Sequence, residues 1–129
     1  MNHLAQIGGV FIYSENPQHL ADWYAQHLGI VYEVAPDGSA YYASLPYLTL
    51  DEGKKAYFAW SVIKSKKRPP VEFKPYMINY RVVDMEGLVQ KLRNAGVEVK
   101  DIEVYNEGKF TWLHDPEGNQ LELWEDTSL

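Results

Sequence analysis

The chain has 129 residues, of which 46% are hydrophobic, and a formal net charge of −6. This length fits one compact core and is short for two independent domains of ordinary size. Because the chain contains no cysteine, disulfide frameworks, thiolate metal sites and cysteine nucleophiles are excluded.

Charge and hydropathy also narrow the range of partners and locations. An acidic chain repels nucleic acid, and the basic run Lys64–Arg68 leads into two prolines, as a solvated linker does. No apolar run approaches the roughly 20 residues that span a bilayer. Met1–Ile12 lacks the basic region and the small-residue cleavage site of a secretion signal. We therefore expect a cytoplasmic protein that binds neither nucleic acid nor membrane.

The first expected elements are a strand and a helix. Apolar residues alternate around Val10 and Ile12, which predicts the strand. Asn16-Pro17 then supplies an N-cap and a proline at the first helical position, and Gly29 is placed to end the helix. Between these signals the apolar residues fall on one stripe, made of Leu20, Trp23, Tyr24 and Leu28.

The rest of the first half predicts strands joined by hairpins. It is rich in Val, Tyr and Trp and is interrupted by turn residues at Pro36–Gly38 and Asp51–Gly53. The first half thus has the order β, α, β, β, β.

The second half repeats this order. Ile78, Tyr80 and Val82 alternate as in a strand, Asp84 can cap a helix 68 residues after Asn16, and Gly96 can end it. Turn residues follow at 106–108 and 115–119. The duplication predicts an α+β fold of two tandem βαβββ modules, at residues 4–64 and 75–126 of a single domain spanning 1–129. The charged, proline-rich stretch between them is the expected boundary.

Three segments resemble the vicinal oxygen chelate superfamily of glyoxalases, bleomycin-resistance proteins and extradiol dioxygenases. They are WYAQHLGI (Trp23–Ile30), Arg81–Val99 and Phe110–Glu125, and the most specific part is the turn DPEGN before the strand LELWE. The resemblance covers nearly the whole chain. It implies a glyoxalase-like fold, with both modules forming a curled mixed sheet around a central cavity, and a homodimer.

Members of this superfamily usually hold a divalent metal with four side chains, from the first and last strands of both modules. Of these positions, Glu122 matches one, whereas the first-strand positions fall on Gly9 and Met77. The strand at 56–64 contains no Asp, Glu or His. We therefore expect no family-type metal centre and no cofactor, which argues against lactoylglutathione lyase and dioxygenase activities. His114, beside a turn, is expected to be structural more often than functional.

Strand alternation predicts which side chains face the cavity. Glu122 shares its face with Gln120 and Trp124, Met77 shares its face with Asn79 and Arg81, and Gly9 shares its face with Phe11 and Tyr13. In one interpretation Arg81 and Glu122 form an ion pair across the cavity. In the other, Arg81 or Asn79 fixes an anionic or carbonyl ligand while Glu122 transfers a proton. Glu122 is the candidate catalytic residue, and the candidate ligand-binding residues are Tyr13, Trp60, Asn79, Arg81 and Trp124.

Two functions remain open. The first is a metal-free protein that encloses a small aromatic or carbonyl compound, for sequestration or resistance. The alternative is a glyoxalase-like lyase or isomerase in which Glu122, with Arg81 or His114, transfers a proton next to a carbonyl. A purely structural module fits less well, because polar residues occupy faces where a solid core would use Val or Leu.

Overall fold

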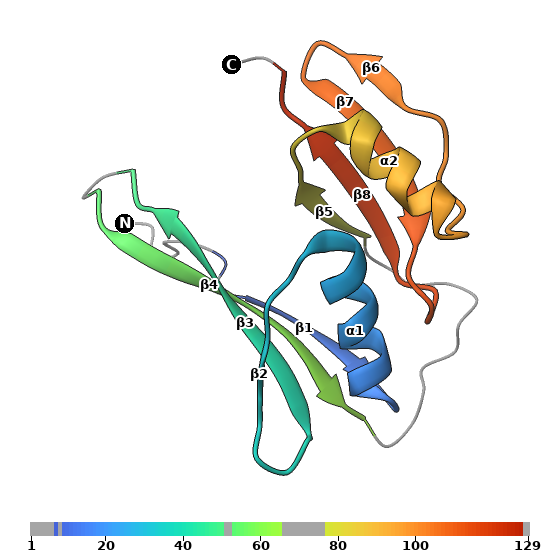
Figure 1. The fold of residues 1–129 in the computed structure, drawn as a ribbon. Coiled ribbons are helices and arrows are strands. Elements are labelled where there is room, and N and C mark those ends of the chain that lie inside the picture. Colours follow the sequence, from blue (N-terminus) through green and yellow to red (C-terminus); the bar gives the residue numbers. More distant parts are fainter. Residues whose placement is uncertain (1–6, 8, 51–52, 66–76, 128–129) are drawn as a thin grey trace. The chain divides into compact units, whose positions relative to one another are not determined.

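The computed structural model describes residues 7, 9–50, 53–65 and 77–127. The chain divides into two compact units, residues 1–69 and 70–129. Each unit holds one βαβββ module, and Figure 1 shows the helix of each lying against its own sheet. Most of the expected boundary, 64–75, lies outside the described residues. No helix in the described ranges is long and apolar enough to cross a membrane.

Unit 1 is built from a four-stranded mixed sheet and one helix. Its elements are β1 (Gly9–Ser14), α1 (Pro17–Leu28), β2 (Glu33–Val34), β3 (Ala40–Leu48) and β4 (Lys55–Lys64). The strand order is β1-β4-β3-β2; β1 runs parallel to β4, and the other neighbours are antiparallel. The parallel pair requires a crossover, which α1 provides.

Helix α1 begins and ends as its sequence predicts. The Asn16 side chain accepts a hydrogen bond from the His19 backbone N–H, and Pro17 occupies the first turn. Gly29 adopts the left-handed conformation with φ of 73°, and its N–H donates to the Ala25 carbonyl. These caps satisfy backbone groups that the helix itself leaves unpaired.

The core of unit 1 lies between α1 and the sheet. Leu20 and Tyr24 of α1 are fully buried, as are Val62 and Trp60 of β4. The Trp60 ring lies 4.7 Å from that of Tyr24 and 5.8 Å from that of Tyr32, measured between ring centroids. Contacts between large rings of this kind stabilise a small core beyond the area they bury.

Unit 2 repeats the arrangement. Its elements are β5 (Met77–Arg81), α2 (Met85–Asn94), β6 (Glu103–Tyr105), β7 (Gly108–His114) and β8 (Gln120–Glu125). The strand order is β5-β8-β7-β6, again with one parallel pair, β5 with β8. Gly9 and Met77 are equivalent, since each begins the first strand of its unit. The structure thus has the predicted α+β architecture of two βαβββ modules, as two four-stranded mixed sheets.

The core of unit 2 joins α2 to the centre of its sheet. Met85, Val89 and Leu92 of α2 are buried, as are Leu121 and Leu123 of β8. Asp84 caps the helix from the left-handed conformation, φ 52°, and its side chain accepts a hydrogen bond from Gly87 N–H. Because successive strand residues point to opposite faces, this core determines which side chains lie on the other side of the sheet.

Candidate functional site

We call the side of the unit 2 sheet that faces away from α2 the open face. Leu121 and Leu123 of β8 are 1% and 0% exposed, so Glu122 between them lies on the open face, as the sequence predicts. Strand pairing arranges this face in three rows across β5, β8 and β7. The rows are Arg81–Trp124–Phe110, Asn79–Glu122–Trp112 and Met77–Gln120–His114.

The middle row centres on the Glu122 carboxylate. Asn79 Nδ2 donates to Glu122 Oε1 over 2.7 Å, and Trp112 Nε1 donates to Glu122 Oε2 over 2.8 Å. Both donors are neutral, so the hydrogen bonds orient the carboxylate without cancelling its charge. The interpretation that Arg81 pairs with Glu122 is wrong.

Arg81 instead belongs to a stack in the first row. Its guanidinium pairs with Asp126 at 2.5 Å and lies 4.8 Å above the Trp124 ring. Trp124 in turn lies parallel to Phe110, with ring centroids 6.1 Å apart and an interplanar angle of 5°. The Trp124 indole N–H donates to the Glu107 carbonyl over 3.0 Å. This stack fixes a flat aromatic surface beside Glu122.

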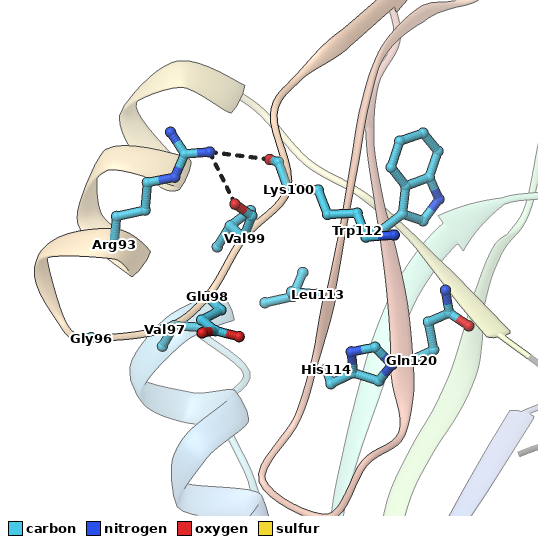
Figure 2. Close-up of a pocket in the computed structure, with 10 residues that line it drawn as sticks. All are labelled: Arg93, Gly96, Val97, Glu98, Val99, Lys100, Trp112, Leu113, His114 and Gln120. Atoms are coloured by element: carbon cyan, nitrogen blue, oxygen red, sulfur yellow. Dashed lines mark hydrogen bonds between the residues drawn. The ribbon is translucent and has the colours of Figure 1, made fainter. Parts of the chain in front are cut away.

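The third row borders a cleft of about 700 Å³ at the edge of the sheet. One wall is the segment Gly96–Lys100, which follows α2, and the other is formed by β7 and β8 (Figure 2). Arg93 donates to the carbonyl oxygens of Val99 and Lys100 over 3.0 and 3.3 Å, which holds the segment in place. Three residues of the open face also line the cleft, namely Trp112, His114 and Gln120.

In unit 1 the predicted ligand-binding residues lie on opposite faces of the sheet. Phe11 and Tyr13 point away from α1 and are 53% and 56% exposed. Trp60 points toward α1 and is 1% exposed. Its neighbours across the sheet are Val10 and Ala43, so the alternation of β4 places it in the core. This placement corresponds to core packing and leaves Trp60 no surface to offer a ligand.

The open face of unit 2 thus brings together Asn79, Arg81, Glu122 and Trp124. The sequence marks Trp112 only as a strand aromatic that could pack in the core or stack on a flat ligand, and does not single it out as the second partner of Glu122. A signal for it exists in the turn 115–119, because residues at equal distances from Glu117 become neighbours when β7 and β8 pair. Folding the two strands about this turn places Trp112 opposite Glu122.

The residues present do not fit the family's four-ligand metal centre. Gly9 offers no ligand atom, and a Cβ at this position would lie 2.5 Å from the Ala59 carbonyl oxygen. Met77 supplies only a thioether, a poor ligand for hard or borderline cations. In the parts of the chain that the structure describes, no group of three or more His, Cys, Asp or Glu side chains could hold a metal ion.

The sequence matches no family model and no curated protein. Solved structures do match. A glyoxalase/dioxygenase from Nostoc punctiforme has a TM-score of 0.71 at 15% identity, covering 96% of this chain and 92% of its own. A glyoxylase/bleomycin resistance protein/dioxygenase domain from Frankia sp. EAN1pec has a TM-score of 0.68 at 14% identity, covering 95% and 93%. A lactoylglutathione lyase from Agrobacterium tumefaciens has a TM-score of 0.66 at 12% identity, covering 96% of both chains.

This chain therefore has the glyoxalase-like fold, in agreement with the resemblance to the vicinal oxygen chelate superfamily. One fold of this kind serves unrelated chemistries, so the likeness at these identities establishes architecture and leaves the activity to be argued from the site.

Proposed function

We propose that this protein binds a small planar compound on the open face of unit 2, without a family-type metal centre. The observation that carries the proposal is the Glu122 carboxylate, oriented by Asn79 and Trp112 and flanked by aromatic rings. A face that served only for packing would favour aliphatic side chains, because burying a carboxylate is costly. Oriented polar groups among aromatic rings are typical of ligand sites.

Glu122 has capacity for a ligand. A carboxylate has about four acceptor positions, and the two described hydrogen bonds use one on each oxygen. A hydroxyl or amino group of a ligand can therefore donate to Glu122 while its ring packs on Trp112 or Trp124.

The test is a titration of the full chain with small aromatic and dicarbonyl compounds. Binding is detected from changes in the amide chemical shifts and in the melting temperature of the protein. We expect at least one compound to bind, with shifts concentrated on β7 and β8. Glu122→Gln should weaken binding roughly fivefold or more, since it replaces a hydrogen bond to a charged group by a neutral one.

The matched control is Glu33→Gln, which removes the same charge from an exposed position of β2 in unit 1. It should leave the affinity unchanged. The proposal fails if no compound binds, or if both substitutions weaken binding equally.

A second candidate function is proton transfer next to a carbonyl, in a lyase or isomerase. It is favoured by one observation: the described partners of Glu122 are neutral, while Arg81 pairs with Asp126. The carboxylate can take a proton from the carbon beside a carbonyl; the C–H electron pair then forms the C=C bond of an enolate, and the C=O π pair moves onto the carbonyl oxygen. If that carbon carries a hydroxyl group, the hydroxyl proton passes to this oxygen. Glu122 then returns its proton to the former carbonyl carbon, which completes an isomerisation without any oxidant.

Deuterium exchange separates the two functions. Hydroxyacetone and phenylacetone are incubated with the protein in deuterated water, and loss of the carbon-bound proton signal is followed by NMR. Exchange that disappears in Glu122→Gln supports proton transfer. If these compounds bind without exchange, proton transfer is excluded and only the binding function remains.

A further inference from the structure

We infer that the cleft beside the open face binds a carboxylate, so that the ligand is a small aromatic acid. This inference rests on the proposed function, because it names the chemistry of the ligand at that same site. The cleft measures about 700 Å³ and shares Trp112, His114 and Gln120 with the open face. A ligand can thus contact Glu122 and the cleft at the same time.

The lining of the cleft favours a negative group. Its charged residues are Arg93, Lys100 and Glu98. Because Arg93 is paired with Asp101, Lys100 is the cation of the lining that can attract an anion. In the described part of the chain, no hydrogen bond or ion pair engages the Lys100 ammonium or the His114 imidazole. These two donors are therefore available to an anion entering the cleft.

Arg93 has a different part in this arrangement. Its guanidinium donates to the carbonyls of Val99 and Lys100 and also to Asp101 Oδ1, at 3.2 Å. The Thr111 hydroxyl donates to the Lys100 carbonyl over 2.6 Å. The backbone of Lys100 is thus fixed from both walls of the cleft, and only its side chain must order when an anion binds.

Trp112 belongs to both the open face and the cleft and forms the wall between them. Its indole N–H is bonded to Glu122, so the ring is held in one orientation. Figure 2 shows the Lys100 side chain extending toward Trp112, with His114 beside Gln120 further along the strands. His114 lies two residues beyond Trp112 on β7, roughly 7 Å along the strand. Lys100 and His114 therefore offer hydrogen-bond donors at different points along this wall.

The charges also fix the direction of the ligand. A carboxylate placed next to Glu122 would be repelled, whereas the same group near Lys100 is attracted. The acid therefore points into the cleft, and an amino or hydroxyl group at the opposite end of the ring donates to Glu122. A compound with both groups is para-aminobenzoate.

The experiment is calorimetric titration of the full chain with para-aminobenzoate and with para-aminobenzamide, which differ only in replacing the acid by an amide. We expect the acid to bind roughly tenfold more tightly, as for a hydrogen bond to a charged group. Lys100→Met should remove this preference, and a melting temperature equal to that of the parent chain would show that the variant is folded. Lys100→Arg should retain the preference.

A matched control removes the same charge elsewhere in unit 2. Lys91 lies on the exposed side of α2 and does not line the cleft, so Lys91→Met should keep the preference for the acid. His114→Leu is a second test inside the cleft. It removes the imidazole N–H donor and should weaken binding of the acid more than binding of the amide.

Three results would overturn the inference. If acid and amide bind equally well, the cleft is no anion site, while the proposed function stands. If Lys91→Met and Lys100→Met lower the affinity for the acid equally, the preference reflects the overall charge of the protein rather than the cleft. If neither compound binds at its solubility limit and the wider panel also fails, the inference and the proposed function fall together.

Discussion

Asn79 and Trp112 hold Glu122 from the two strands that flank β8. Each oxygen of the carboxylate accepts one hydrogen bond, from the amide at 2.7 Å and from the indole at 2.8 Å. A carboxylate held in this way loses little further freedom when a ligand binds, which lowers the cost of binding. The two donors thus act on a ligand through Glu122, as positioning residues.

Replacing Asn79 tests this positioning role. Asn79 is exposed, so water can take its place on Glu122, and we expect Asn79→Ala to cost about 1 kcal/mol or less in unfolding free energy. Ligand affinity should fall several-fold, because Glu122 must then be ordered on binding. Calorimetric titration and urea unfolding of the same variant measure both effects. Asn94→Ala, at the exposed end of α2, is the control, and an equal loss of affinity in this variant would contradict the positioning role.

Asp115 is the residue on which the turn between β7 and β8 depends. It is 5% exposed, and its Oδ1 accepts hydrogen bonds from the backbone N–H groups of Glu117 and Asn119 at 2.9 and 3.0 Å. Its Oδ2 accepts a third bond from Asn119 Nδ2, at 2.7 Å. A buried carboxylate with three donors defines the geometry of this turn, and therefore the register that sets Trp112 opposite Glu122.

We expect Asp115→Ala to lower the unfolding free energy by about 2 kcal/mol or more, because it leaves buried donors without an acceptor. Urea denaturation followed by tryptophan fluorescence measures the change. The comparison is Asp37→Ala in unit 1, whose exposed side chain accepts from Ser39 N–H over 3.0 Å. If both substitutions cost the same small amount, the Asp115 bonds do not stabilise the turn.

At the scale of elements, α2 and β7 are joined at the surface by an ion pair. Lys109 Nζ lies 2.5 Å from Glu86 Oε1. The hydrogen bond from Lys109 lowers the pKa of Glu86, and the same bond raises the pKa of Lys109. Both shifts favour the charged forms, as expected for partners of opposite sign.

The sign of these shifts predicts a dependence on pH. Because the pKa of Glu86 is lower in the folded chain, its contribution is complete above its ordinary value of 4.5 and is lost as the pH falls through the folded value. Glu86→Gln should therefore be less stable than the parent chain at neutral pH and equal to it in acid. Unfolding curves at a series of pH values below neutrality test this. A difference that stays constant across the series would contradict it.

The sequence alone predicts the helices and strands, but it does not predict which residues become neighbours when distant strands pair. The caps at Asn16 and Asp84 and the turn residues locate both helices and the hairpins, because these signals act between residues close in the chain. The side of β8 on which Glu122 lies follows from alternation with Leu121 and Leu123. Its partner Trp112 could be placed from the turn at 115–119, because β7 and β8 are joined by that turn. Its partner Asn79 and the burial of Trp60 depend instead on the pairing of strands far apart in the sequence, which the pattern within one strand does not encode.

At the scale of the whole molecule, each unit has a core of its own, around Tyr24 and Trp60 in unit 1 and around Leu92 and Leu123 in unit 2. That the two modules act as one domain, that the protein is cytoplasmic and that it forms a homodimer stay predictions. The homodimer comes from the family resemblance and is the most direct to examine.

Light scattering coupled to size-exclusion chromatography should give twice the chain mass of 14.9 kDa. The measurement is repeated over a range of loading concentrations, since a weak dimer dissociates on dilution. A mass that stays at 14.9 kDa at every concentration would make the protein a monomer.

The close packing of Gly9 on β4 makes the two modules unequal as starting points for new chemistry. A histidine at position 9 would bring its Cβ to 2.5 Å from the Ala59 carbonyl oxygen, so β1 would have to move before the side chain fits. Position 77 is 41% exposed and accepts a larger side chain without such a movement. Protein engineers seeking a metalloenzyme on this scaffold would therefore need to redesign the backbone of one module and only a side chain of the other.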